Sequence, residues 1–168
     1  MAEIGLRAIE KEDLEIIQAW RNSELVMPNC RQYRKLSMVD MVRWYDSLSR
    51  DGDYNLTNDM FMLHDRCGCI GVAGIVRIDW RNRKGEVSFY IGEPAECNEE
   101  TIVNGLNATL HFGLATLGLR KLYFPCYSYN QFLPIYEKVM DREYVAREEY
   151  YWEGKFYDRI VLVKYASI

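Results

Sequence analysis

The feature that most constrains the fold is a change in hydrophobic period near the middle of the chain. Glu86–Ile91 alternates apolar and polar side chains, which predicts a β-strand. Glu99–Leu117 then carries apolar side chains at helical spacing, and Gly118 is placed to end that helix. The apolar and aromatic run Lys121–Tyr127 predicts another strand. A strand, a long helix and a strand in succession indicate a parallel crossover.

The segments around this crossover predict a mixed α/β domain. Three extended runs before the helix are joined by short turns, which favours an antiparallel meander. The whole order predicts one domain over residues 1–168, with a mixed, mostly antiparallel sheet of about six or seven strands and helices on both faces. The remaining expected strands are Gly5–Ile9, Met60–His64, Cys69–Ile78, Glu143–Tyr151 and Phe156–Tyr165, and the remaining expected helices are Asp13–Asn22, Ser37–Leu48 and Gln131–Met140.

Length and charge narrow the classes of function. A chain of 168 residues fits one domain, and its formal net charge is -4 with no long run of one sign. Nucleic-acid binding usually needs a basic stripe, so we expect no nucleic-acid partner. No secretory signal or apolar span of membrane length is apparent, which makes the cytoplasm the default location and a membrane role unexpected.

Metal and thiol chemistry is not indicated by the cysteines. There are five, an odd number, and the pair Cys67 and Cys69 has no second pair at zinc spacing. We expect free thiols and no metal site. Cys67 and Cys69 would share a face if both lay on one strand.

Four motifs, in this order and spacing, resemble the Gcn5-related N-acetyltransferases. They are similar to the branch that includes ribosomal-protein N-terminal and nucleotide-sugar amine acetyltransferases. The resemblance extends from about Ile4 to Tyr165. The matching pieces are Leu6-Arg7 with Glu12-Asp13-Leu14 and Trp20-Arg21-Asn22, then Gly85-Glu86-Val87-Ser88-Phe89-Tyr90-Ile91-Gly92, then Asn130 with Tyr136-Glu137-Lys138, and finally Glu149-Tyr150 with Glu153-Gly154-Lys155-Phe156-Tyr157-Asp158.

The resemblance implies that acetyl-CoA binds where the fourth and fifth strands splay apart. The pantetheine arm of the cofactor would pair with the fourth strand, and its pyrophosphate would rest on backbone N–H groups at the start of the next helix. The positions that this implies for cofactor binding are Phe89, Tyr90, Ile91, Asn98, Glu99, Glu100, Thr101 and Asn130.

The pyrophosphate loop departs from the family pattern. That pattern is Gln or Arg, two residues, Gly, one residue, then Gly or Ala, and its glycine positions fall on Asn98 and Glu100. Asn98 is a good helix cap, and Glu99 and Glu100 stabilise a first helical turn, so the loop can satisfy its own helix start. The carboxylates would also repel phosphates. The N–H groups nevertheless remain, so cofactor binding stays open beside a different acyl donor or a non-catalytic binding or assembly module.

The resemblance also assigns two catalytic roles. Glu86 matches a carboxylate that helps to deprotonate the amine, and Tyr136 matches a tyrosine that protonates the leaving thiolate. A solvated strand glutamate and a packed helix tyrosine are the structural alternatives. Asn130 lies one residue closer to Tyr136 than is usual, and a plain helix cap is its alternative role.

The acceptor is expected between the first two helices and the last hairpin. Tyr150, Tyr151 and Trp152 form an aromatic cluster there, and Arg31 and Arg34 precede the second helix. Such a wall suits an amine on a small molecule or a peptide N-terminus. The sequence leaves a homodimer open.

Overall fold

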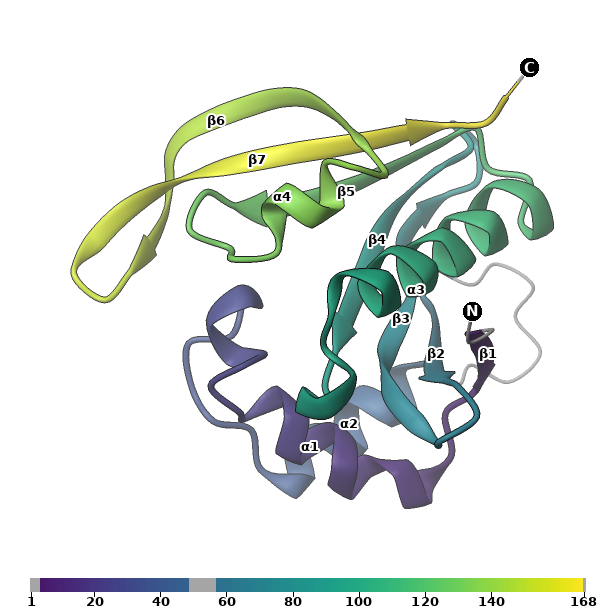
Figure 1. The fold of residues 1–168 in the computed structure, drawn as a ribbon, viewed down its shortest axis with the longest axis vertical. Coiled ribbons are helices and arrows are strands. Elements are labelled where there is room, and N and C mark those ends of the chain that lie inside the picture. Colours follow the sequence, from purple (N-terminus) through teal and green to yellow (C-terminus); the bar gives the residue numbers. More distant parts are fainter. Residues whose placement is uncertain (1–3, 49–56, 168) are drawn as a thin grey trace.

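A computed structural model describes residues 4–48 and 57–167, and these residues build a seven-stranded sheet in the order β1-β2-β3-β4-β5-β7-β6 (Figure 1). The strands are β1 (Gly5–Ala8), β2 (Asp59–His64), β3 (Cys69–Asp79), β4 (Lys84–Ile91), β5 (Lys121–Tyr127), β6 (Asp141–Trp152) and β7 (Lys155–Tyr165). The helices are α1 (Leu14–Arg21), α2 (Met38–Leu48), α3 (Glu99–His111) and α4 (Leu133–Tyr136), with 3₁₀ turns η1 (Lys11–Asp13), η2 (Met27–Asn29) and η3 (Pro94–Glu96) and a π turn η4 (Phe112–Thr116).

The sheet is antiparallel except at its centre. Strands β1 to β4 form a meander, and α3 then crosses over so that β5 runs parallel to β4. The predicted crossover and the mixed sheet are therefore confirmed. Beyond β5, the long hairpin of β6 and β7 turns at Glu153 and Gly154, both at positive φ, which suits a two-residue hairpin.

The pairing of β4 with β5 is short. It runs from Lys84 opposite Lys121 to Glu86 opposite Tyr123, after which β4 pairs only with β3 and β5 only with β7. The predicted splay between the fourth and fifth strands is thus present. It leaves one edge of β4 without a strand partner in the described part of the chain.

Two hydrophobic cores lie on the opposite faces of the sheet. Leu63 belongs to the core that α3 and α4 cover, whereas its neighbour Met62 belongs to the core that α1 and α2 cover. Adjacent strand residues point to opposite faces, so this split confirms the prediction of helices on both faces. Ile17 and Leu106 are fully buried members of the two cores.

Four local features differ from the expectations. The apolar spacing of Ser37–Leu48 predicts that Val42 lies on the core-facing stripe of this helix. On α2, however, Val42 is 42% exposed, and Trp44 packs on the core. Helix α3 continues into the π turn η4, in which Gly113 lies against Leu122. Gly118, at φ +66, then ends the helical segment. Helix α4 is only four residues long. Cys67 lies in a turn, so it does not share a strand face with Cys69.

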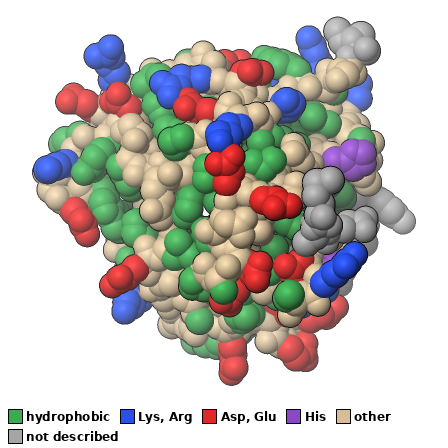
Figure 2. Space-filling view, viewed as in Figure 1, with side chains coloured by type: hydrophobic (Ala, Val, Ile, Leu, Met, Phe, Trp, Pro, Cys, Tyr) green, Lys and Arg blue, Asp and Glu red, His purple; other side chains and the backbone are tan. Residues whose placement is uncertain are grey.

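The described surface carries both signs of charge. Figure 2 shows acidic and basic side chains interspersed on one face, with carboxylates gathered in its lower half, over α1 and the start of α3. Within the described ranges, no helix is long and apolar enough to cross a membrane.

Candidate functional site

A cleft opens where β4 and β5 separate. We call its inner part, with a cavity volume of about 30 Å³, the narrow cleft. Its outer part, with about 230 Å³, is the wide cleft. The two parts share six lining residues, so they lie side by side. These shared residues are Asn29, Cys30, Phe89, Tyr90, Phe124 and Pro125.

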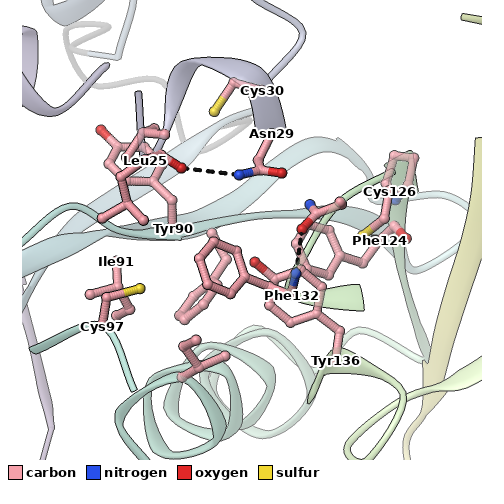
Figure 3. A pocket seen from close by; sticks show the side chains of 15 residues that line it. Leu25, Asn29, Cys30, Tyr90, Ile91, Cys97, Phe124, Cys126, Phe132 and Tyr136 are labelled. Carbon is pink, nitrogen blue, oxygen red and sulfur yellow. Dashed lines mark hydrogen bonds between the residues drawn. The ribbon is translucent and has the colours of Figure 1, made fainter. Parts of the chain in front are cut away.

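The narrow cleft is built mainly from aromatic rings and thiols. Figure 3 shows the rings of Tyr90, Phe124, Phe132 and Tyr136 around it. It is apolar except for a few convergent polar atoms, which is typical of a small-molecule site. Five predicted site residues line it: Phe89, Tyr90, Ile91, Asn130 and Tyr136, and the thiols of Cys30, Cys97 and Cys126 complete its walls.

Tyr136 is held in place by other rings. Its ring centroid lies 5.0 Å from that of Phe124 and 6.2 Å from that of Phe89. The residue is 4% exposed, and burial raises its pKa well above the usual value for tyrosine. Among the described residues, no hydrogen-bond partner occupies its hydroxyl. This phenol can therefore donate a proton to a ligand.

Tyr90 is a second buried phenol. Its hydroxyl is inaccessible to solvent and has no hydrogen-bond partner within the described ranges. Burial raises the pKa of Tyr90, and Arg21 partly opposes that effect. A buried hydroxyl without a partner is costly to the folded state.

Glu86 lines the wide cleft, as its predicted role requires, but it is not a free carboxylate. It is 2% exposed, and its two oxygens accept from Arg31 and Arg77. The Arg77 Nη1 lies 2.8 Å from one Glu86 oxygen. The backbone of Arg77, whose side chain reaches Glu86, has a positive φ of 51°. The hydrophobic periodicity of the sequence does not reveal such a backbone conformation.

Asn130 lies at the turn before α4, beside the narrow cleft. Its side-chain oxygen accepts from the Phe132 backbone N–H at 2.9 Å and so closes the turn that leads into α4. It is also buried against the narrow cleft.

The start of α3 satisfies part of its own hydrogen bonding. The Asn98 side chain accepts from the Thr101 N–H at 3.0 Å, and the Ile102 N–H donates to the Asn98 carbonyl. In the described part of the chain, the backbone N–H groups of Glu99 and Glu100 have no partner. The Glu99 carboxylate instead pairs with Lys138 at 2.6 Å.

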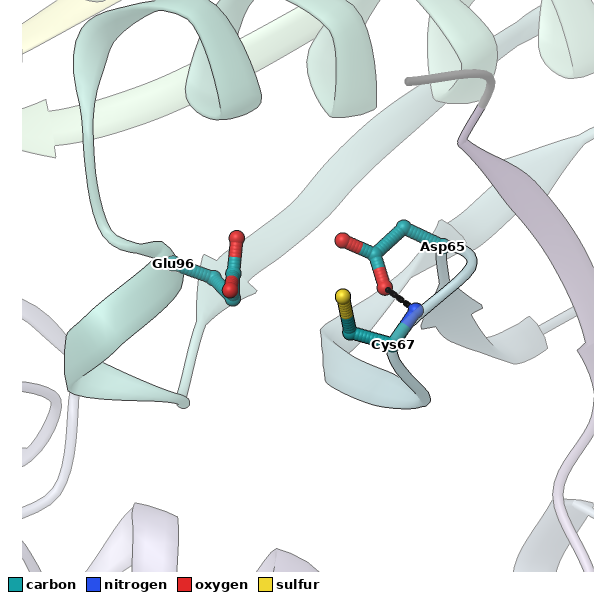
Figure 4. Close-up of side chains that lie close together, drawn as sticks. All are labelled: Asp65, Cys67 and Glu96. Atoms are coloured by element: carbon teal, nitrogen blue, oxygen red, sulfur yellow. Dashed lines mark hydrogen bonds between the residues drawn. The ribbon is translucent and has the colours of Figure 1, made fainter.

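An acidic hollow of about 290 Å³ lies beside this helix start, and we use that name for it below. Its lining includes the side chains of Asp65, Glu96 and Glu100, with Asn98 and Thr101. The ligand atoms of Asp65, Cys67 and Glu96 lie within 4.8 Å of one another (Figure 4). Accessible groups of this kind are common without a metal ion, so their clear consequence is a negative potential at the hollow.

The predicted acceptor residues divide into two sets. Arg31 lines the wide cleft, whereas Arg34 pairs with Asp40 at the start of α2. The ring of Tyr150 stacks on that of Tyr127, with 3.8 Å between the two ring centroids, and Tyr127 lines the wide cleft. Tyr151 is 60% exposed on the outer hairpin, away from the cleft lining.

Sequence reasoning missed two groups of cleft residues. Arg21 lines the wide cleft. It belongs to the Trp20-Arg21-Asn22 motif, for which the sequence indicates no functional role. Asn29 and Cys30 lie in and after the short turn η2, where no periodic signal marks an inward side chain.

Comparisons with known proteins agree with this architecture. A family model described as an acetyltransferase (GNAT) domain matches residues 3–132. No match is found among curated proteins. A solved spermidine N-acetyltransferase from Vibrio cholerae, in complex with CoA and spermine, has a TM-score of 0.87 at 21% identity over 97% of this chain and 95% of that chain. A dodecameric structure of spermidine N-acetyltransferase from the same organism gives 0.79 at 20% identity, covering 97% and 94%. At such identities, these structures bear on the fold.

Proposed function

We propose, since this chain belongs to the acetyltransferase (GNAT) family, that it transfers the acetyl group of acetyl-CoA to the primary amine of a small molecule. Membership confirms the enzyme class and the acyl donor that the sequence motifs indicated. The solved relatives are named for acetylation of an amine, which favours an amine acceptor here. A peptide N-terminus is the competing acceptor.

The observation that carries the proposal is the cleft between β4 and β5. Beyond Glu86, the edge of β4 that faces the cleft pairs with no strand among the described residues. Free backbone groups on such an edge can bind an extended ligand as an added strand would. The amide-bearing arm of acetyl-CoA is a ligand of that kind, and its thioester would then lie near Tyr136.

The reaction that we assign to this cleft breaks one carbon–sulfur bond. The neutral amine attacks the thioester carbon, the thiolate of CoA leaves, and the sulfur takes a proton. Tyr136 is our proposed donor of that proton, because its raised pKa keeps the hydroxyl protonated at neutral pH. A free N–H on the β4 edge would stabilise the oxyanion of the intermediate.

Glu86 is our proposed acceptor of the amine proton. Because Arg31 and Arg77 already donate to its oxygens, we expect the proton to reach it through water in the wide cleft. A carboxylate has lone pairs left after two such bonds. The arginines also fix its position toward the cleft.

The acidic hollow has a measurable consequence for the donor. Carboxylates near the start of α3 would repel the phosphates of CoA, and salt screens such repulsion. We therefore expect acetyl-CoA to bind more tightly at 0.5 M salt than at 0.05 M salt, the opposite of a site that attracts phosphate through exposed cations.

Titration calorimetry with acetyl-CoA and with CoA tests the proposal, followed by an assay of thiol release with a panel of amines. We expect both ligands to bind and at least one amine to release CoA. Cys97→Phe, which fills the narrow cleft, should abolish binding. Val39→Phe on the exposed side of α2 adds the same ring elsewhere and should have no effect.

Absence of binding heat at millimolar ligand, with the protein folded, would refute the transferase. Binding of CoA without turnover of any amine or peptide would instead support the alternative of a non-catalytic module.

A further inference from the structure

The wide cleft has an excess of positive charge. Arg21 and Arg31 line it, and Glu86 is the carboxylate in its lining. That carboxylate is already paired with Arg31 and with Arg77. The acceptor space therefore offers a cation that its own carboxylate does not neutralise.

Arg21 is that cation, and it is held in a fixed orientation. Its Nε donates to the Gln32 side-chain oxygen at 3.1 Å, and the Gln32 amide donates to the Arg21 carbonyl at 3.0 Å. Gln32 is only 5% exposed. Over residues 4–48 and 57–167, no carboxylate pairs with Arg21, so its terminal nitrogens remain available.

The rest of the wide cleft is apolar and suits an apolar side chain of a ligand. Its walls include Trp44, Met60, Val72 and Val76. Tyr90 also lines it through its ring, while its hydroxyl is buried. A planar guanidinium suits a carboxylate, because it can donate two parallel hydrogen bonds to the two oxygens.

We propose that the acceptor is an amine that also carries a carboxylate and an apolar side chain, with the carboxylate bound by Arg21. This inference rests on the proposed function, since it names the acceptor of the same cleft. A polyamine, by contrast, would bring further positive charge to Arg21 and Arg31 and would find Glu86 already paired.

The test uses matched ligands that differ only in the carboxylate. L-Phenylalanine, L-leucine and L-methionine are each compared with their amides, and spermidine is the polycationic probe. Binding to the CoA-loaded protein is measured by calorimetry, and acetylation by thiol release. We expect each amino acid to bind at least about tenfold more tightly than its amide, as loss of a charged hydrogen-bond pair predicts.

Three variants separate the role of Arg21 from a general charge effect. Arg21→Gln should reduce the affinity for the amino acid to that for its amide and leave CoA binding unchanged. Arg21→Lys should restore part of the preference, because it restores the charge without the planar fork. Arg43→Gln makes the same charge change on the exposed side of α2 and should have no effect.

The outcomes distinguish this inference from the proposed function. Binding of amino acids that depends on Arg21, without thiol release, would support carboxylate binding by Arg21 and refute the transferase. Acetylation of spermidine or of the amides in preference to the amino acids would support the transferase and overturn the inference. Equal binding of amino acids and amides, or no loss in Arg21→Gln, would also overturn it. Thermal unfolding of each variant checks that the fold is retained.

Discussion

Tyr136 illustrates how packing can prepare one side chain for chemistry. Three phenylalanine rings lie near its ring, at centroid distances of 5.0 to 6.4 Å, and leave it little freedom to rotate. The same burial raises its pKa, so the hydroxyl stays protonated, which is the form that a proton donor needs. Position and protonation state thus have one physical origin.

Replacement of Tyr136 by Phe keeps the ring and removes the proton. We expect kcat to fall by about 100-fold or more, as loss of a general acid predicts, while the dissociation constant of acetyl-CoA stays the same. Thiol-release kinetics and calorimetry measure the two quantities. Tyr33→Phe, at a side chain that is 82% exposed, is the matched control. Unchanged kcat in Tyr136→Phe would remove the assigned role.

Five residues of the narrow cleft could be predicted from the sequence, but the charged neighbours of the cleft could not. Tyr136 and Asn130 are found through a local motif whose spacing fixes where they lie. The pairing of Glu86 with Arg31 joins positions that are 55 residues apart, and it depends on the path of the turn at η2. No periodicity encodes such a contact.

The start of α3 shows a competition between a helix cap and a ligand. Asn98 uses the Thr101 N–H that a phosphate would otherwise take, and the carboxylate of Glu100 adds to the negative potential of the acidic hollow. The helix is stabilised by this arrangement at the expense of anion binding.

Asn98→Gly should shift that balance. Glycine at a helix cap costs only a few tenths of a kcal/mol relative to asparagine, and the change releases the Thr101 N–H. We expect acetyl-CoA to bind about fivefold more tightly, the value of one additional hydrogen bond. Calorimetry measures the affinity and thermal unfolding the stability.

Ser37→Gly is the control for that change. Ser37 and Asp40 form the equivalent cap of α2, remote from the cleft lining. This variant should lower the melting temperature similarly without any effect on acetyl-CoA. If both variants leave the affinity unchanged, the amides of α3 do not contact the cofactor.

Hydrophobic periodicity located the elements well and their ends less well. Strand β5 has the predicted bounds, and its alternate apolar residues Leu122, Phe124 and Cys126 are buried. Helix α4 is shorter than predicted, since Asn130 and Pro134 restrict its beginning and the chain after Tyr136 turns toward β6. On α2, Val42 is exposed and Trp44 packs on the core, a tertiary choice between two apolar residues that lie two positions apart.

At the scale of the molecule, the sheet separates two cores that share few partners. Ile17 lies in the core under α1 and α2, and Ile75 lies in the core under α3 and α4; both are fully buried. A change in one core should therefore not alter the packing of the other.

A double-mutant cycle in denaturant measures this independence. Ile17→Val and Ile75→Val should each cost about 0.5–1.5 kcal/mol of unfolding free energy, and their effects should add to within about 0.5 kcal/mol. Ile75→Val with Leu122→Val is the same-core comparison, since both side chains approach Gly113, and it should deviate from additivity. Strong coupling across the sheet would contradict the two-core description.

The outer strand β6 has a consequence for colloidal behaviour. An exposed sheet edge is a template on which other chains can polymerise. Charged side chains occupy half of β6, and its register with β7 shifts at two places, between Arg142 and Tyr144 and between Ala146 and Tyr150. The charges and the register shifts make β6 a poor template for another strand. We therefore expect this sheet edge to resist fibrillar aggregation in concentrated solutions of the protein.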